Sequence, residues 1–147
     1  MAAFAAQPQA ALVWADHALM DEQGRPQGEV RWVSPGGDFR RVLIAGNPIC
    51  NATATVRREV IAAIGGFNES VPRVCDGAAW TQIAARGYRF VHLPRLVLDY
   101  RLHAGNDSAR FAPMTHDRDT ALLAAAQAYV RHGVVAGPAD LAWLRGV

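Results

Sequence analysis

Three neighbouring stretches decide the expected fold: NPICNATATVRREVIAAIGGFNES (residues 47–70), CDGAAWTQIAARGYRFVHLP (75–94) and RLVLDYRLH (95–103). Within them, residues 49–56 are β-rich, and residues 57–64 have apolar side chains at helical spacing. The two glycines that follow favour a left-handed end to that helix. A second helix is expected over 77–87, and two strands, 88–93 and 95–103, flank Pro94. Strands and helices are therefore both expected in this region.

The residues before this region add a hairpin and two short helices. Residues 2–6 have the pattern of the end of a helix, so the chain is expected to begin in the middle of a fold. Residues 11–19 alternate as a strand, and a turn at 21–24 leads into a second short strand near 30–33. A short helix is expected over 39–45, before a Gly-Asn-Pro break.

The C-terminal residues have helical patterns and no strand pattern. Residues 117–132 place Leu122, Leu123, Ala126 and Tyr129 on one face, and a short helix is expected after Pro138. No low-complexity linker divides the chain. We therefore expect one domain, in which residues 1–105 form the main α/β part and residues 106–147 an appended helical segment.

Composition excludes several classes of protein. The chain has 147 residues, 51% of them apolar and 19% charged, which is typical of a globular domain and not of a disordered chain. Its net charge is +2 with scattered arginines, so we expect no nucleic-acid partner. The widely separated Cys50 and Cys75 favour a reducing compartment, although a disulfide is an alternative. Asp16 and His17 interrupt the apolar N-terminus, so we expect no signal peptide and no transmembrane segment.

Several motifs occur together in one order along the chain: Arg57-Arg58, Gly65-Gly66-Phe67-Asn68-Glu69, Asp76, Trp80, Gly87-Tyr88, Pro94 and Tyr100-Arg101-Leu102-His103. Over about residues 5 to 108 the chain resembles the C-terminal, acceptor-side half of inverting family-2 glycosyltransferases of the GT-A fold. The resemblance implies an α/β fold: a partial GT-A-like mixed sheet with flanking helices, whose nucleotide-binding half is absent. It also implies an ancestral transfer of a sugar from a nucleotide-sugar donor to a hydroxyl of a glycan or lipid-linked acceptor.

The resemblance assigns the catalytic base to Asp76. Such a base takes the proton of an acceptor hydroxyl while that oxygen attacks the anomeric carbon from the face opposite the departing nucleotide. The family has a second acidic residue directly before the base, and this chain has Cys75 there. The alternative role for Asp76 is structural, because an aspartate directly before a helix is a favoured N-cap.

The resemblance also implies a metal ligand and a metal. His103 matches a histidine that binds the divalent ion, Mn²⁺ or Mg²⁺, against the donor diphosphate in many GT-A enzymes. The Asp-x-Asp motif that completes such a site is absent from the matching region, so we expect no metal bound to this chain alone. A lone histidine at a strand end is otherwise a surface residue. Alternation also places Asp99, Arg101 and His103 on one strand face, which indicates a cleft.

Two tryptophans are candidate acceptor-binding residues. Trp80 and Trp143 have the spacing of helical core positions, whereas Trp14 and Trp32 lie near the expected hairpin. Aromatic faces stack on sugar rings, so Trp14 and Trp32 are candidates for contact with the acceptor.

The absence of the nucleotide-binding half affects the assembly and the location that we expect for the chain. A half-domain exposes apolar edge strands, so we expect a homodimer. We expect the isolated chain to be inactive and cytoplasmic, with the inner face of the membrane as an alternative location. Two other hypotheses stay open: a non-catalytic binding or assembly module that kept the fold, and an enzyme completed by a second polypeptide.

Overall fold

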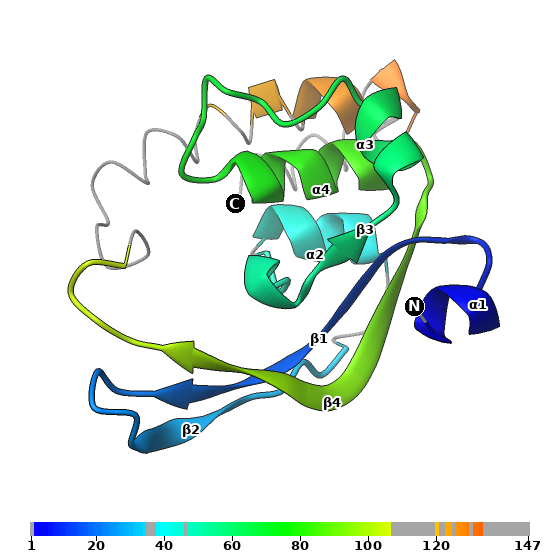
Figure 1. Ribbon diagram of the computed structural model, residues 1–147. Helices are drawn as coiled ribbons and strands as arrows, with labels where there is room; N and C mark the ends of the chain where they lie inside the picture. Colours follow the sequence, from blue (N-terminus) through cyan, green and yellow to red (C-terminus); the bar gives the residue numbers. More distant parts are fainter. Residues whose placement is uncertain are drawn as a thin grey trace.

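The computed structural model describes residues 2–34, 38–45, 47–106, 120, 123–124, 126–129 and 131–133. These residues form one mixed sheet with helices packed on it, an α/β arrangement as the sequence predicts (Figure 1). The elements in chain order are α1 (Ala2–Ala6), β1 (Ala10–Met20), β2 (Pro26–Val30), α2 (Phe39–Ala45), the 3₁₀ helix η1 (Asn51–Thr53), β3 (Thr55–Val56), α3 (Arg58–Ala63), α4 (Cys75–Ala85) and β4 (Arg89–Arg101).

Strand β1 is the centre of the sheet, because every other described strand pairs with it. One edge of β1 pairs in parallel with β4 along almost its whole length. The other edge pairs antiparallel with β3 at residues 12–13 and with β2 at residues 17–20. No residue from Ala10 to Asp16 is more than 6% exposed. This near-continuous burial is typical of a strand that is covered on both faces.

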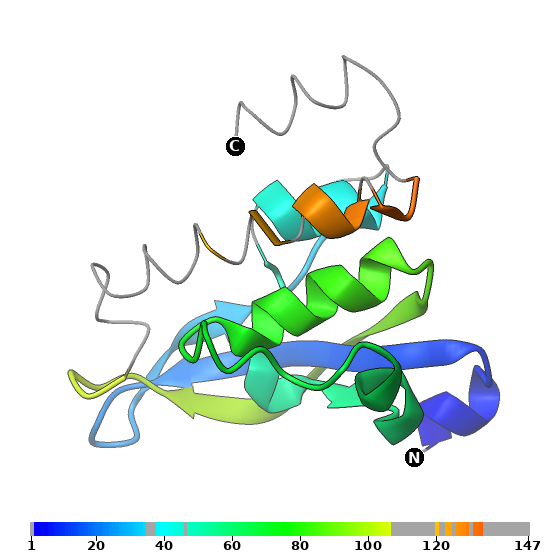
Figure 2. The ribbon, with the colours of Figure 1, turned by 90° about the horizontal axis from the view of Figure 1, so that it is seen from above.

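The two faces of β1 are covered by different elements. Leu12 and Trp14 pack with Trp80 and Ile83 of α4 in the main hydrophobic cluster. Ala10, Val13 and Val91 form a smaller cluster on the opposite face, against Phe4 and its neighbours in α1. Viewed from above, α4 lies along the sheet and α2 lies beside it (Figure 2). Helix α4 is therefore fixed over β1 by burial of apolar surface.

Strand β4 corrects the expectation of two strands on either side of Pro94. It is one strand of 13 residues, and the pairing with β1 skips at the proline: Leu93 is opposite Ala15, and Leu96 is opposite Asp16. Figure 1 shows that β4 as a whole is bent. Among the described residues, β4 pairs only with β1, so its outer edge is open. An irregularity on an edge strand is where a sheet tolerates a proline, which has no N–H to donate.

The structure also corrects the expectation that residues 49–56 are β-rich. Of these residues, Asn51–Thr53 form η1, and only Thr55 and Val56 pair with β1. The Thr53 hydroxyl donates to the carbonyl of Cys50 at 2.9 Å and accepts the N–H of Ala15 at 3.3 Å. Such local side-chain bonds to the backbone compete with strand pairing. The second strand of the hairpin likewise lies earlier than expected, at Pro26–Val30.

The glycine signals are confirmed. After α3, Gly65 and Gly66 have φ of 89° and 88°, and Gly87 after α4 has φ of 76°. Glycine adopts this left-handed backbone without the clash that a Cβ would cause. The bounds expected for α1 and α2 are confirmed as well.

Only part of the expected helical segment after residue 106 is described. Residues 120, 123–124, 126–129 and 131 are helical. Tyr129 is fully buried as expected, and its hydroxyl donates to the carbonyl of Arg40 at 3.0 Å, but Leu123 is exposed and not buried. The helix expected after Pro138 lies outside the described residues. None of the helices in the described part of the chain is long and apolar enough to cross a bilayer.

Candidate functional site

The candidate residues lie at opposite ends of α4. Asp76 is in its first turn, whereas Trp14 and Trp32 line a pocket that also contacts its last turn, at Ala84. Ala84 is eight positions after Asp76, which corresponds to about 12 Å along a helix axis. The structure therefore does not bring the expected base and the expected acceptor-binding tryptophans into one site.

Asp76 is held in place by the burial of α4 behind it. Seven residues of this helix are buried, Trp80 and Ile83 among them. Asp76 itself is half-buried, and its Oδ1 accepts the N–H of Gly77 at 2.8 Å. The N-cap position belongs to Val74, which makes no side-chain capping bond, so the N-cap role for Asp76 is wrong. As a first-turn residue, its charge is favourable at the positive end of the helix dipole.

The described residues beside Asp76 include a thiol and an amide and no second carboxylate. Cys75 and Cys50 are both free thiols and half-buried, so the structure contains no disulfide between them. A Cβ built on Gly77 would lie 3.5 Å from Nδ2 of Asn47. The loop before η1 thus approaches the first turn of α4 closely.

The strand face with Asp99 and Arg101 is exposed. Asp99 pairs with Ala18 and Arg101 with Met20, so by alternation they lie on the same sheet face as Trp14. The Arg101 guanidinium donates from Nη1 to the carbonyls of Glu22 at 2.7 Å and Asp21 at 3.2 Å. Arg101 therefore ties the end of β4 to the β1–β2 turn.

In Figures 1 and 2, α4 begins on the side toward which β1 and β4 run.

His103 follows β4 and is exposed. Its Nδ1 accepts the N–H of Gly105 at 3.1 Å. Within the described ranges, no three His, Cys, Asp or Glu side chains come together in a way that could hold a metal ion. The described residues thus offer His103 as a single ligand and do not form a metal site by themselves, so the metal stays a prediction.

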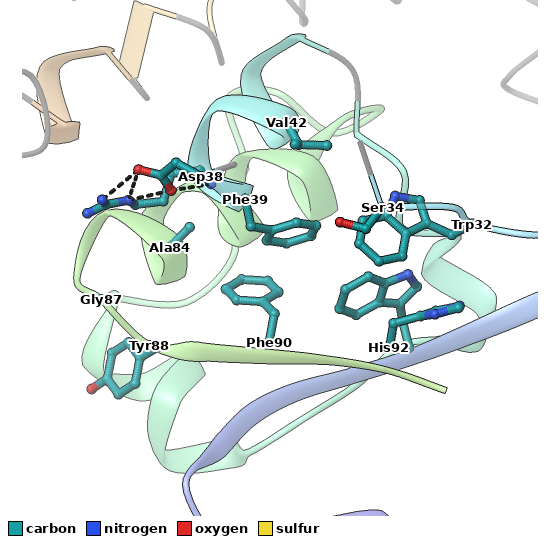
Figure 3. A pocket seen from close by; sticks show the side chains of 12 residues that line it. Trp32, Ser34, Asp38, Phe39, Val42, Ala84, Gly87, Tyr88, Phe90 and His92 are labelled. Atoms are coloured by element: carbon teal, nitrogen blue, oxygen red, sulfur yellow. Dashed lines mark hydrogen bonds and ion pairs between the residues drawn. The ribbon is translucent and has the colours of Figure 1, made fainter. Parts of the chain in front are cut away.

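An aromatic pocket of about 450 Å³ lies between α2, the end of α4 and the sheet. Its ring-bearing walls are Trp14, Trp32, Phe39, Tyr88, Phe90 and His92. Trp14 is only 3% exposed and stacks on Phe39 with 5.2 Å between ring centroids. Trp32 is half-buried and meets Trp14 edge-on at 5.4 Å. Of the two tryptophans, Trp32 therefore has the surface that a ligand could contact. Figure 3 shows Trp32, Phe39 and Phe90 on neighbouring walls.

A buried carboxylate holds two walls of this pocket. Asp16 Oδ1 accepts the backbone N–H of Trp32 at 3.0 Å and lies 2.7 Å from Nε2 of His92. Because a carboxylate only accepts, Nε2 carries the proton in this bond. Burial would raise the pKa of Asp16, but the hydrogen bonds from Trp32 and His92, with the charges of His92 and Arg31, hold it below its ordinary value. Asp16 therefore stays ionised and joins β1 to β4 and to the segment after β2.

An ion pair lies at the edge of the pocket. The Arg40 guanidinium donates to both oxygens of Asp38, from Nε at 2.8 Å and from Nη2 at 2.6 Å (Figure 3). These bonds lower the pKa of Asp38 and raise that of Arg40, so both groups stay charged. Roughly a third of each side chain is exposed. The pair therefore presents an acceptor and a donor side by side to solvent.

Sequence reasoning missed the Asp16–His92 pair and the Asp38–Arg40 pair. The available signal was an aspartate directly after the apolar run LVWA, because a charge within a buried strand needs a partner.

Compared with known proteins, the chain matches no family model and no curated protein. The residues and their geometry are therefore the basis for assigning a function.

Asp16→Ala should lower the free energy of unfolding by about 3 kcal/mol or more, because it leaves a buried N–H and a buried imidazole without their acceptor. Urea unfolding measures this change. Glu29→Ala is the control, since Glu29 forms only an exposed pair with Arg31 and its loss should change stability by less than about 1 kcal/mol. Equal effects of the two substitutions would contradict the role of Asp16.

Asp16 also predicts a dependence of stability on pH. The pKa of Asp16 in the folded protein lies below the ordinary 3.8. The ionised carboxylate therefore contributes fully to the free energy of unfolding above pH 3.8, and this contribution is lost as the pH falls through the folded pKa. The difference in Tm between the wild type and Asp16→Asn should therefore shrink between about pH 5 and about pH 2. Thermal unfolding followed by circular dichroism tests this, and a difference that stays constant over the range would refute it.

Proposed function

We propose that this chain is the acceptor-side part of a family-2 glycosyltransferase with a partial GT-A-like fold, and that Asp76 is its catalytic base. One observation carries the proposal. Asp76 is a half-buried carboxylate in the first turn of a firmly buried helix, on the side of the molecule toward which β1 and β4 run. A base must combine fixed position with access to substrate, and this placement provides both.

The positions of the other motif residues support the proposal. Arg57 donates from Nε to the carbonyl of Ala10 at 2.7 Å and from Nη2 to that of Pro8 at 2.9 Å, which fixes the start of β1. Trp80 fills the core under α4. The glycine pair and Gly87 end their helices with positive φ. Arg57 thus fixes the start of β1, Trp80 packs α4 on the sheet, and the glycines end α3 and α4.

The proposed step is a single displacement. The oxygen of an acceptor hydroxyl forms a bond to the anomeric carbon of the donor sugar, and the bond from that carbon to the nucleotide diphosphate breaks. The diphosphate leaves with the bonding electron pair, and the hydroxyl proton passes to a carboxylate oxygen of Asp76. Attack from the face opposite the leaving group inverts the anomeric centre.

The nucleotide-sugar would be held outside the described residues. No described side-chain cluster could bind a divalent ion, so the Mn²⁺ or Mg²⁺ that such donors need would require further ligands beside His103. That ion would neutralise charge on the departing diphosphate. The two free thiols are compatible with the reducing environment of the cytoplasm, where we place the protein.

A non-catalytic binding or assembly module is the second candidate. The observation that favours it is Cys75, which occupies the position of the first acidic residue of the pair. A module of this kind would keep the buried face of α4 and have no need of the Asp76 carboxylate.

Asp76→Asn should abolish sugar transfer, with a loss of about 100-fold or more, and lower the Tm by no more than about 4 °C, the effect of losing one charge at the start of a helix. The assay measures nucleotide release and product formation from a set of nucleotide-sugars, with the protein recovered from its own host together with whatever it binds. The matched control is Glu59→Gln, because Glu59 is also a first-turn carboxylate, on the neighbouring α3. Transfer at the original rate in Asp76→Asn would refute the assignment, and no transfer by the wild type would favour the binding module.

The proposal includes a homodimer. In the described part of the chain, the outer edge of β4 has no partner strand, and Val97 on this strand is 53% exposed. Open strand edges and exposed apolar residues favour association between copies. Light scattering after size exclusion should therefore give twice the mass of 15.9 kDa. A monomer at high protein concentration would count against the dimer.

A further inference from the structure

The chemistry proposed for Asp76 does not involve the aromatic pocket. It lies at the other end of α4, and its walls come from four separate parts of the chain: β1, the described residues between Trp32 and Val42, the end of α4, and the start of β4. The rings of Trp32, Phe39 and Phe90 leave open space between α2 and the sheet (Figure 3). A volume of about 450 Å³ is within the range of small-molecule sites.

The polar groups at the edge define the charge that a ligand can have. Asp38 and Arg40 neutralise each other through three hydrogen bonds, yet both remain partly exposed. An anionic ligand would meet the Asp38 carboxylate, and a cationic ligand would meet the Arg40 guanidinium. A neutral ligand with hydroxyl groups can donate to Asp38 and accept from Arg40 at the same time.

The combination of aromatic walls and a neutral donor–acceptor pair matches the chemistry of a sugar ring. One side of a pyranose presents C–H groups that pack on aromatic faces, and its rim presents neighbouring hydroxyls. We propose that this pocket holds one ring of a neutral glycan, remote from the ring whose hydroxyl reacts at Asp76. Since about 12 Å of helix separates the two places, the acceptor would be an oligosaccharide and not a single sugar. This identification of the acceptor rests on the proposed function, whereas binding of the glycan does not.

The pocket is preorganised for such binding. The Asp16 carboxylate fixes the backbone of Trp32 and the ring of His92, which lies 5.2 Å from the Trp32 ring. Rigid walls reduce the entropy that ordering would otherwise cost on binding. The Tyr129 hydroxyl bonds the Arg40 carbonyl and so fixes the backbone at the edge as well.

The test is binding of the full chain to an array of neutral oligosaccharides, followed by tryptophan-fluorescence titration with the oligosaccharides retained. Trp32→Ala should weaken binding about 10-fold or more, as loss of a central aromatic contact does. Arg40→Gln, an exposed edge substitution that leaves the aromatic core intact, should weaken it too. The matched control is Val33→Ala, because Val33 is next to Trp32, is 82% exposed and does not line the pocket.

Retention of a neutral oligosaccharide that depends on Trp32 and Arg40, and not on Val33, would support the proposal. Retention of no neutral glycan, retention of charged glycans only, or binding that Trp32→Ala leaves unchanged would overturn it. Asp76→Asn separates the two proposals, because it should abolish transfer and leave this binding intact. Glycan binding without any transfer by the wild type would refute the enzyme alone.

Discussion

The arrangement of the sheet depends on one buried carboxylate. Asp16 lies in the middle of β1, where it accepts a hydrogen bond from the backbone after β2 and another from His92 of β4. A single ionised side chain thus connects β1 to the segment 16 residues further on and to β4, 76 residues further on. A charge at this depth costs free energy unless it is fully bonded, so its partners are constrained in position as strongly as the apolar core is. The two tryptophans and His92 pack around it, and the aromatic pocket takes its shape from that packing.

Helix α4 relates the two candidate regions to each other. Its buried face packs on β1, its first turn presents Asp76, and its last turn forms part of the aromatic pocket. Because the helix is rigid, the distance between the two regions is fixed by its length. An extended ligand suits this arrangement, since one end can be held in the pocket while the other end is presented to the carboxylate.

Local signals allowed much of the fold to be predicted from the sequence. Gly65, Gly66 and Gly87 mark helix ends because few other residues adopt positive φ, and the hairpin follows from the turn after β1. The continuity of β4 could not be predicted, because Pro94 is tolerated only through an irregular pairing on an open edge. The 3₁₀ helix replaced an expected strand because the Thr53 hydroxyl bonds the local backbone. A helix next to Asp76 was predictable, but it begins at Cys75 and not at residue 77, so Asp76 lies inside its first turn. The apolar run before Asp16 signals that this carboxylate needs a partner, but nothing local identifies His92, 76 residues away, as that partner. The pocket depends on that contact and was missed for the same reason.

The parallel pairing of β1 with β4 also affects how the protein is made. Ala10 pairs with Arg89, so the ribosome adds 79 residues before the first of these partners is available. At typical rates of synthesis this takes about 4 to 16 seconds. During that time the most apolar strand of the chain is exposed as a nascent segment, with only β2 and β3 to pair with. The pairing at the centre of the sheet therefore cannot begin to form until this interval has passed.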